Sequence, residues 1–192
     1  MKKLAALTGT IALAGALGAC SSSGSSTGAA ATTSAAPKPT TETMTGQVTG
    51  AAAVANTTVI PLRLTGVVNT TGTFTPPNTS ATHVTITFPT KAGNLVVAAS
   101  APDANAAPTV VNAAACRFKS TIHATYTVDG SKSTGTFADA TGSGKATLIF
   151  EADGPKYASG SHKGQCNMSS NAQPMAAGAL STFAAAGPLT LK

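Results

Sequence analysis

The sequence predicts an all-β fold, an antiparallel barrel of about eight to ten short strands, with a β-sandwich as the alternative. Three observations predict it. Apolar and polar residues alternate with a period of two in several stretches rich in Thr and Val. Turn sequences that contain glycine, such as Asp129-Gly130, separate these stretches. After the amino-terminal region, the periodicity of an amphipathic helix is nearly absent.

The amino terminus predicts export and lipid anchoring. Residues 1–19 combine Lys2-Lys3 with an apolar run whose helix would rise about 21 Å, too short for a membrane span and typical of a signal peptide. The run ends in Leu17-Gly18-Ala19-Cys20, which resembles the bacterial lipobox. The resemblance implies acylation of the Cys20 thiol, cleavage just before it, and anchoring to the outer face of the cell membrane. The alternative is an ordinary secretory signal.

Residues 20–41 are expected to form a disordered tether. After Cys20 they contain only Ser, Gly, Thr, Ala, Pro and Lys38, which bury too little apolar surface to offset the entropy of ordering. A flexible linker of this length has a root-mean-square reach of roughly 25 Å. Residues 42–192 then suffice for one β-rich extracytoplasmic domain with a single core.

The charge pattern argues against a nucleic-acid partner. Loss of Lys2 and Lys3 with the signal peptide leaves ten of the twelve basic residues, against six acidic ones. These basic residues are scattered rather than clustered beside stacking aromatic residues. The partners that the sequence favours are the membrane, through lipid on Cys20, and either a cell-wall polymer or an apolar small molecule.

The alternating stretches predict the strands in chain order. The expected strands are 42–50, 57–68, 72–75, 82–88, 95–99, 117–128, 134–137, 145–152, 157–166 and 180–191, the last broken at Gly187-Pro188. An irregular loop is expected over residues 100–112, and a glycine turn over residues 139–144. Ala124 and Ala146 fall on inward faces, where their small side chains leave room at the centre of a barrel.

Cys116 and Cys166 are expected to form a disulfide. Acylation of Cys20 leaves these two thiols as a pair in an oxidising compartment. Closing a loop of about 51 residues stabilises a domain by at most about 4 kcal/mol in the chain-entropy model. The alternative is a metal site that also uses His123 or His162, but the sequence lacks a Cys-x-x-Cys pair or a third nearby ligand.

Residue patterns for catalysis, metals and cofactors are weak, and we assign no catalytic residue, metal ligand or cofactor. His83, His123 and His162 come from different predicted strands. Gly142-Ser143-Gly144-Lys145 lacks the earlier glycine and the final hydroxyl residue of a phosphate loop. The serines lie in no Gly-x-Ser-x-Gly sequence, and a chain without Trp is a poor candidate for sugar stacking.

One segment resembles a known family. Residues 135–144 follow the pattern Gly-x-Phe-x-x-Ala-x-Gly-x-Gly, which is similar to a turn in exported actinobacterial β-proteins and in small barrels related to allene oxide cyclase and dirigent proteins. The resemblance covers about a dozen residues and departs at Ser131-Lys132-Ser133-Thr134, where such proteins often have Gly-Gly-Thr-Gly. It implies a barrel that guides or cyclises apolar small molecules. It transfers no catalytic residue to this chain.

Two functions follow as hypotheses. The first is a lipid-anchored surface domain that is not an enzyme and that acts by binding or as part of the cell envelope. The second is a barrel that binds or isomerises an apolar small molecule, which an interior cavity of several hundred Å³ would favour and a fully packed interior would exclude.

Overall fold

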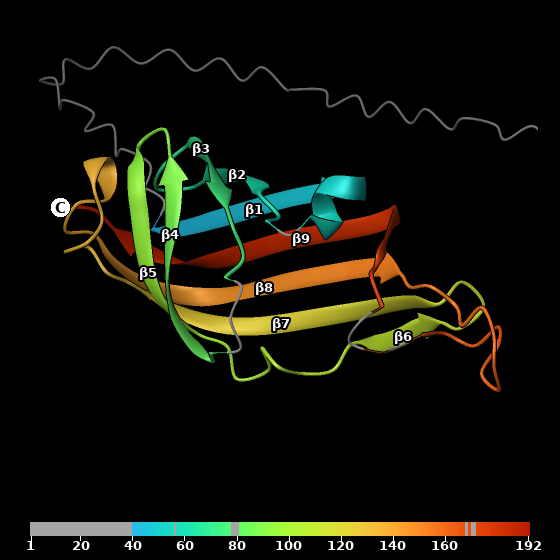
Figure 1. Ribbon diagram of the computed structural model, residues 1–192. Coiled ribbons are helices and arrows are strands. Elements are labelled where there is room, and N and C mark those ends of the chain that lie inside the picture. The colour runs from blue at the N-terminus through green and yellow to red at the C-terminus, as the bar shows by residue number, and fades with distance from the viewer. Residues whose placement is uncertain (1–39, 56, 78–80, 168, 170–171) are drawn as a thin grey trace, which may run out of the picture. The chain divides into compact units, whose positions relative to one another are not determined.

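The computed structural model describes residues 40–55, 57–77, 81–167, 169 and 172–192, which form eight antiparallel strands closed into a barrel and one strand added outside it (Figure 1). The predicted all-β barrel is therefore confirmed. The strands are β1 (Thr41–Thr49), β2 (Ile60–Thr65), β3 (Thr70–Phe74), β4 (His83–Thr90), β5 (Gly93–Ser100), β6 (Thr109–Asn112), β7 (Arg117–Val128), β8 (Thr141–Asp153) and β9 (Met175–Thr190). Two short 3-10 helices are η1 (Gly50–Val54) and η2 (Gly135–Phe137).

The predicted signal peptide, Cys20 and all of the predicted tether except Thr40 and Thr41 lie outside the described residues. In the described ranges, no helix is both long enough and apolar enough to cross a membrane.

The barrel closes between two strands that are distant in the sequence. Its order is β5-β4-β3-β2-β1-β9-β8-β7, and β7 returns to β5. Residues 125–128 of β7 pair with residues 97–100 of β5, whereas residues 117–119 of β7 pair with β6. The edge of β7 therefore changes partner along its length, and residues 120–124 lie between the two pairings.

The seam between β3 and β4 is the sparsest in the barrel. Its register contains the single pair Gly72 and Thr90, supplemented by a 3.0 Å hydrogen bond from the Lys91 amide to the Thr71 carbonyl. Neighbouring β4 and β5, in contrast, pair over eight positions. Most of β4 therefore borders the barrel interior and makes no backbone pairing with β3.

One end of the barrel is filled by η2. Phe137 is fully buried there and belongs to the main core cluster. The Thr134 amide donates to the Asn94 carbonyl at 2.9 Å, and the Thr136 amide donates to the Ala92 carbonyl at 2.8 Å. The β4–β5 turn thus holds η2 across the opening, and we call this the closed end.

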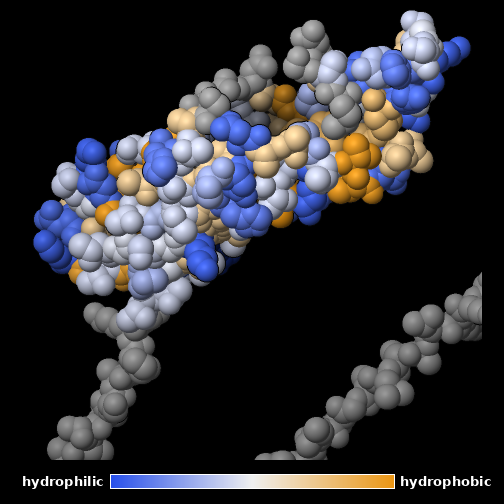
Figure 2. Space-filling model, turned by 90° about the horizontal axis from the view of Figure 1, so that it is seen from below, coloured by the Kyte–Doolittle hydropathy of each residue, from blue (hydrophilic) through white to orange (hydrophobic). Residues whose placement is uncertain are grey.

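The three longest strands, β7, β8 and β9, continue past the barrel at the other end (Figure 1). Their inner face carries a second core of Ala152 and Ala179, which packs against Ala53 of η1. Phe118 and Phe150 pack beside it in a tilted arrangement, with ring centroids 5.9 Å apart. The outer surface is mostly hydrophilic with hydrophobic patches between (Figure 2).

Three expected elements are wrong. Residues 134–137 alternate like a strand, but Gly135 has a φ of +62° and the segment turns into η2, which carries Phe137 into the barrel. Residues 157–166 form a loop with one isolated bridge, Lys156 to Cys166, because most of their side chains are exposed and have no sheet face to cover. Residues 109–112 of the expected loop form β6.

The expected glycine turn at residues 139–144 is also wrong. Asp139 makes the turn with a φ of +55°, and Gly142 and Gly144 lie inside β8. A Cβ at Gly142 would lie 2.4 Å from the Pro188 carbonyl oxygen, and one at Gly144 would lie 2.4 Å from that of Ala186. These glycines are needed because β9 approaches closely, and a turn does not require them.

The expected break at Gly187-Pro188 does not occur, and β9 runs through it. The β8–β9 register omits the two pairs opposite these residues, whereas the β1–β9 register is continuous there. Proline lacks the N–H that a ladder needs. Pairing with β1 therefore keeps the strand intact where pairing with β8 is interrupted.

Candidate binding cavity

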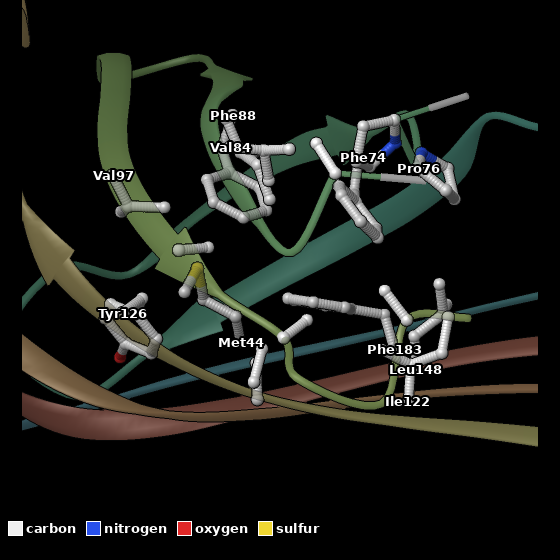
Figure 3. Close-up of a pocket in the computed structure, with 18 residues that line it drawn as sticks. Met44, Phe74, Pro76, Val84, Phe88, Val97, Ile122, Tyr126, Leu148 and Phe183 are labelled. Carbon is white, nitrogen blue, oxygen red and sulfur yellow. The ribbon is translucent and has the colours of Figure 1, made fainter. Parts of the chain in front are cut away.

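The barrel encloses an apolar cavity of about 170 Å³ between its core and the end opposite η2. Every described residue that lines it except Tyr126 has a side chain without nitrogen or oxygen. Figure 3 shows two facing rows of side chains around it, Val97, Phe88, Val84, Phe74 and Pro76 on one side and Tyr126, Met44, Phe183, Leu148 and Ile122 on the other. The remaining lining residues are Pro77, Ala81, Ile86, Ala99, Ala101, Ala104, Ala124 and Ala146.

Small residues create the space on one wall. Ala124 of β7 pairs with Ala146 of β8, and Ala146 pairs with Ala185 of β9. Because all three face inward, a band of methyl groups crosses three strands where larger side chains would fill the centre. The expectation that Ala124 and Ala146 leave room inside the barrel is confirmed.

Three phenylalanines pack together across the cavity, with Phe74 and Phe88 on one side and Phe183 on the other (Figure 3). Phe74 lies 4.5 Å from Phe183 and 5.4 Å from Phe88, measured between ring centroids, and the three rings are mutually tilted. Phe88 and Phe183 complete the triangle at 5.7 Å. Such tilted pairs are favourable geometries, so the three rings join the two sides where the cavity ends against the core.

Tyr126 presents its ring to the cavity while its oxygen points away from the other labelled side chains (Figure 3). Burial raises the pKa of its hydroxyl, and the Glu42 carboxylate raises it further. Glu42 is itself only 3% exposed. Its Oε2 accepts a 2.8 Å hydrogen bond from the Val68 amide, and its Oε1 is buried without a hydrogen-bond partner. Burial raises the Glu42 pKa despite the backbone hydrogen bonds.

Two glycines separate Glu42 from Tyr126 along the wall. Glu42 pairs with Gly187 of β9, and Tyr126 pairs with Gly144 of β8. A Cβ at Gly144 would lie 2.5 Å from the Tyr126 hydroxyl oxygen. Gly144 therefore provides the space that the Tyr126 hydroxyl occupies, whereas a Cβ at Gly187 would lie 2.0 Å from the Ser143 carbonyl oxygen of β8. The sequence did not single out Glu42 or Tyr126 as site residues, although an acidic residue on the same face of β1 as the buried Met44 was a usable signal.

A second hollow, of about 590 Å³, adjoins the cavity and shares Pro76, Pro77 and Leu148 with it. We call it the trough. It lies on the inner face of the long strands beside η1, and its walls include four hydroxyl residues. Its other lining residues are Ala53, Val54, Ala55, Thr57, Thr58, Thr75, Phe150, Pro174 and Ser181.

A loop closes the wall where the edge of β7 changes partner. Ala101 and Ala104 of this loop line the cavity. Both carboxylate oxygens of Asp103 accept hydrogen bonds from the His123 amide at 3.0 Å, and Oδ2 lies 2.9 Å from the His123 Nδ1. The contact with His123 lowers the pKa of the Asp103 carboxyl. We call Asp103 and His123 the clasp. The Asp103 carboxylate accepts the hydrogen bond from the His123 amide that a neighbouring strand would otherwise accept.

The predicted disulfide is present. Cys116 and Cys166 are bonded, with Cα atoms 5.3 Å apart. The bond joins the residue before β7 to the exposed loop that includes His162. It lies beyond the barrel with the ends of the long strands, so it stabilises the extension and does not form part of the cavity.

The three histidines are not brought together. His83 contacts the hydroxyls of Thr82 and Ser100, His123 belongs to the clasp, and His162 contacts Gln165. In the described part of the chain, no group of three or more His, Cys, Asp or Glu residues is placed to hold a metal ion.

The fold and the site define an antiparallel eight-stranded barrel with an apolar interior cavity. Comparison with protein-family models, with curated proteins and with solved structures found no match to this chain.

Proposed function

We propose that this protein is a lipid-anchored cell-surface protein whose barrel binds a small apolar molecule, or the apolar part of a larger one. One observation supports this most strongly: a cavity of about 170 Å³ inside the barrel is lined by apolar side chains and the ring of Tyr126. Apolar cavities of about 150 Å³ stay dry and accept benzene-sized molecules. The cavity therefore has the size and chemistry for a ring or a short branched hydrocarbon.

The location rests on the lipobox ending at Cys20. Acyl chains on that thiol would hold the domain at the outer face of the membrane, where apolar molecules and cell-envelope polymers are both within reach. A cell-wall polymer remains a second partner, for which the scattered basic residues provide weak attraction.

The site favours binding over isomerisation. General acid–base catalysis needs a titratable group within hydrogen-bond reach of the substrate. Tyr126 is the single described lining residue with a polar side-chain atom, and Figure 3 shows its oxygen pointing away from the other side chains.

Toluene binding to the purified extracytoplasmic domain tests this proposal. At ten times its Kd, toluene should add about 1.4 kcal/mol and raise the Tm by roughly 3–6 °C. Ala146→Leu should fill the cavity and abolish the rise, while the exposed Ala98→Leu on β5 should keep it. A wild-type Tm that toluene does not change, with unaltered NMR signals from cavity methyl groups, would overturn the proposal.

A further inference from the structure

The cavity is too small for a complete ligand of ordinary size. Pockets for drug-sized molecules measure roughly 300–1,000 Å³, whereas this one measures about 170 Å³. If the barrel binds an apolar group, as proposed above, the rest of that ligand has to lie outside the cavity.

The trough continues the cavity along the same strands. The inward residues of β8 run from Ala146 in the cavity, through Leu148 in both hollows, to Phe150 in the trough. On β9, Phe183 lines the cavity and Ser181, two residues away on the same face, lines the trough. Four residues of strand span about 13 Å. The two hollows therefore offer an elongated ligand one path of at least this length.

The chemistry changes along that path. Hydrocarbon surrounds the cavity, whereas the trough adds the hydroxyls of Thr57, Thr75 and Ser181. Ser181 is only 5% exposed, so its hydroxyl is held on a sheltered part of the trough. Hydroxyl groups can donate and accept hydrogen bonds, which suits the ester, ether or alcohol groups of a ligand.

The lining also argues against a charged body. None of the described residues that line either hollow is Lys, Arg, His, Asp or Glu. A carboxylate or ammonium group in the sheltered part of the trough, beside Ser181, would lose water without gaining an opposite charge, which is costly. An uncharged group with hydroxyls or an ester loses less and finds partners.

We propose that the ligand is a neutral amphiphile, with a ring-sized or branched hydrocarbon end in the cavity and a hydroxyl- or ester-bearing body in the trough. This inference rests on the proposed function and adds the chemical class of the ligand.

Three probes test the neutral-amphiphile inference separately from the proposed function. They are toluene, which fits the cavity alone, 1-monooctanoylglycerol below its critical micelle concentration, and octanoate at pH 7. We expect the monoglyceride to bind at least tenfold more tightly than octanoate. Ala55→Phe places a ring in the trough at an exposed position with extended backbone, which Phe tolerates. It should weaken monoglyceride binding at least fivefold and leave toluene binding unchanged.

Ala158→Phe is the matched control, because Ala158 is exposed and lines neither hollow. The neutral-amphiphile inference is overturned if octanoate and the monoglyceride bind equally well, or if Ala55→Phe does not weaken monoglyceride binding. In either case, toluene binding would leave the proposed function intact. Failure of toluene to bind overturns the proposed function itself. The Tm of each variant shows whether it is folded.

Discussion

At the scale of single residues, Glu42 is the most unusual position in the barrel. Its carboxyl is buried among core side chains, and one of its oxygens lacks a partner. A buried acid favours its neutral form because burial removes water from the charged one. The raised pKa means that the folded protein binds a proton at Glu42 more tightly than the unfolded chain does.

Glu42→Gln should therefore change how stability depends on pH. The folded-state pKa of Glu42 lies above the ordinary value of 4.5, so its contribution to stability is present below pH 4.5 and is lost as pH rises through the folded pKa. Gln keeps an acceptor for the Val68 amide and does not titrate. The variant should gain free energy of unfolding relative to wild type as pH rises from 4 to 8, measured by urea denaturation.

The informative quantity is how the difference in free energy of unfolding between Glu42→Gln and wild type changes with pH. Any destabilisation by the new amide group is independent of pH and does not alter that slope. Asp103 and Asp129 have lowered pKa values and contribute in the opposite direction, but they are present in both proteins and cancel in the difference. A difference that stays constant across this pH range contradicts the assignment of a raised pKa to Glu42.

Gly144 is the second position where a single residue decides the packing. Gly144→Ala places a methyl group 2.4 Å from the Ala186 carbonyl oxygen and 2.5 Å from the Tyr126 hydroxyl oxygen. Because the first neighbour is backbone of an adjacent strand, it cannot move aside cheaply, and we expect a loss of about 2 kcal/mol, within the range of overpacking.

Denaturation of Gly144→Ala with and without Tyr126→Phe separates the two contacts. The phenylalanine removes the hydroxyl but not the carbonyl, so the double variant should recover only part of the loss. Complete recovery, or an unchanged stability in the single variant, would show that β9 does not constrain this position.

At the scale of elements, the weak points of the barrel lie beside the cavity. β3 and β4 share one register pair, and β7 changes partner between β5 and β6. The loop after β5 covers the edge of β7 where that strand changes partner, and the clasp of Asp103 and His123 holds the loop there. Because Ala101 and Ala104 of the loop line the cavity, the clasp holds part of the cavity wall in place.

Asp103→Asn should accelerate ligand exchange. The amide keeps an acceptor but loses the charge that strengthens hydrogen bonds to the His123 amide and ring. We expect the dissociation rate of a bound neutral dye, N-phenyl-1-naphthylamine, to rise severalfold in stopped-flow measurements, with little change in Tm because the pair is exposed.

Asp129→Asn is the matched control. Asp129 also has a lowered pKa and bonds to Ser131 and Lys132, but it lies at the closed end and not beside the cavity. Equal dye release from Asp103→Asn and wild type would mean that the loop does not control access.

At the scale of the whole molecule, the proposed function joins an anchor to a binding barrel. β1 begins at Thr41, and Thr40 accepts a 2.9 Å hydrogen bond from the Leu189 amide. Thr41 is also beside Gly66, so the described chain enters the barrel at the closed end. On the proposed function, a ligand would reach the cavity from the opposite end, because η2 fills this one.

Cys20→Ser should release the protein from the membrane without changing the barrel. Acylated wild type should partition into the detergent phase and carry the mass of its lipid, while the variant should appear in the medium with the same toluene affinity. Wild type recovered without lipid, or a variant still retained by the membrane, contradicts anchoring at Cys20.

The sequence by itself determined the all-β fold class, most of the strands with their inward faces, and the disulfide pair. Alternation of side chains is a local property with a period of two, so Ile60, Leu62 and Leu64 could be assigned to the core before any partner strand was known. With Cys20 assigned to the predicted lipobox, the sequence left Cys116 and Cys166 as the pair, and these two are bonded.

Only the tertiary structure decided where strands end, how the barrel closes and where the cavity lies. Residues 135–137 form η2 instead of the expected strand because Phe137 is buried in the end of the barrel. β9 continues through Gly187-Pro188 because it stays paired with β1 there. The cavity and the raised pKa of Glu42 arise from residues far apart in the chain. Such features depend on which strands become neighbours, and local alternation carries no information about that.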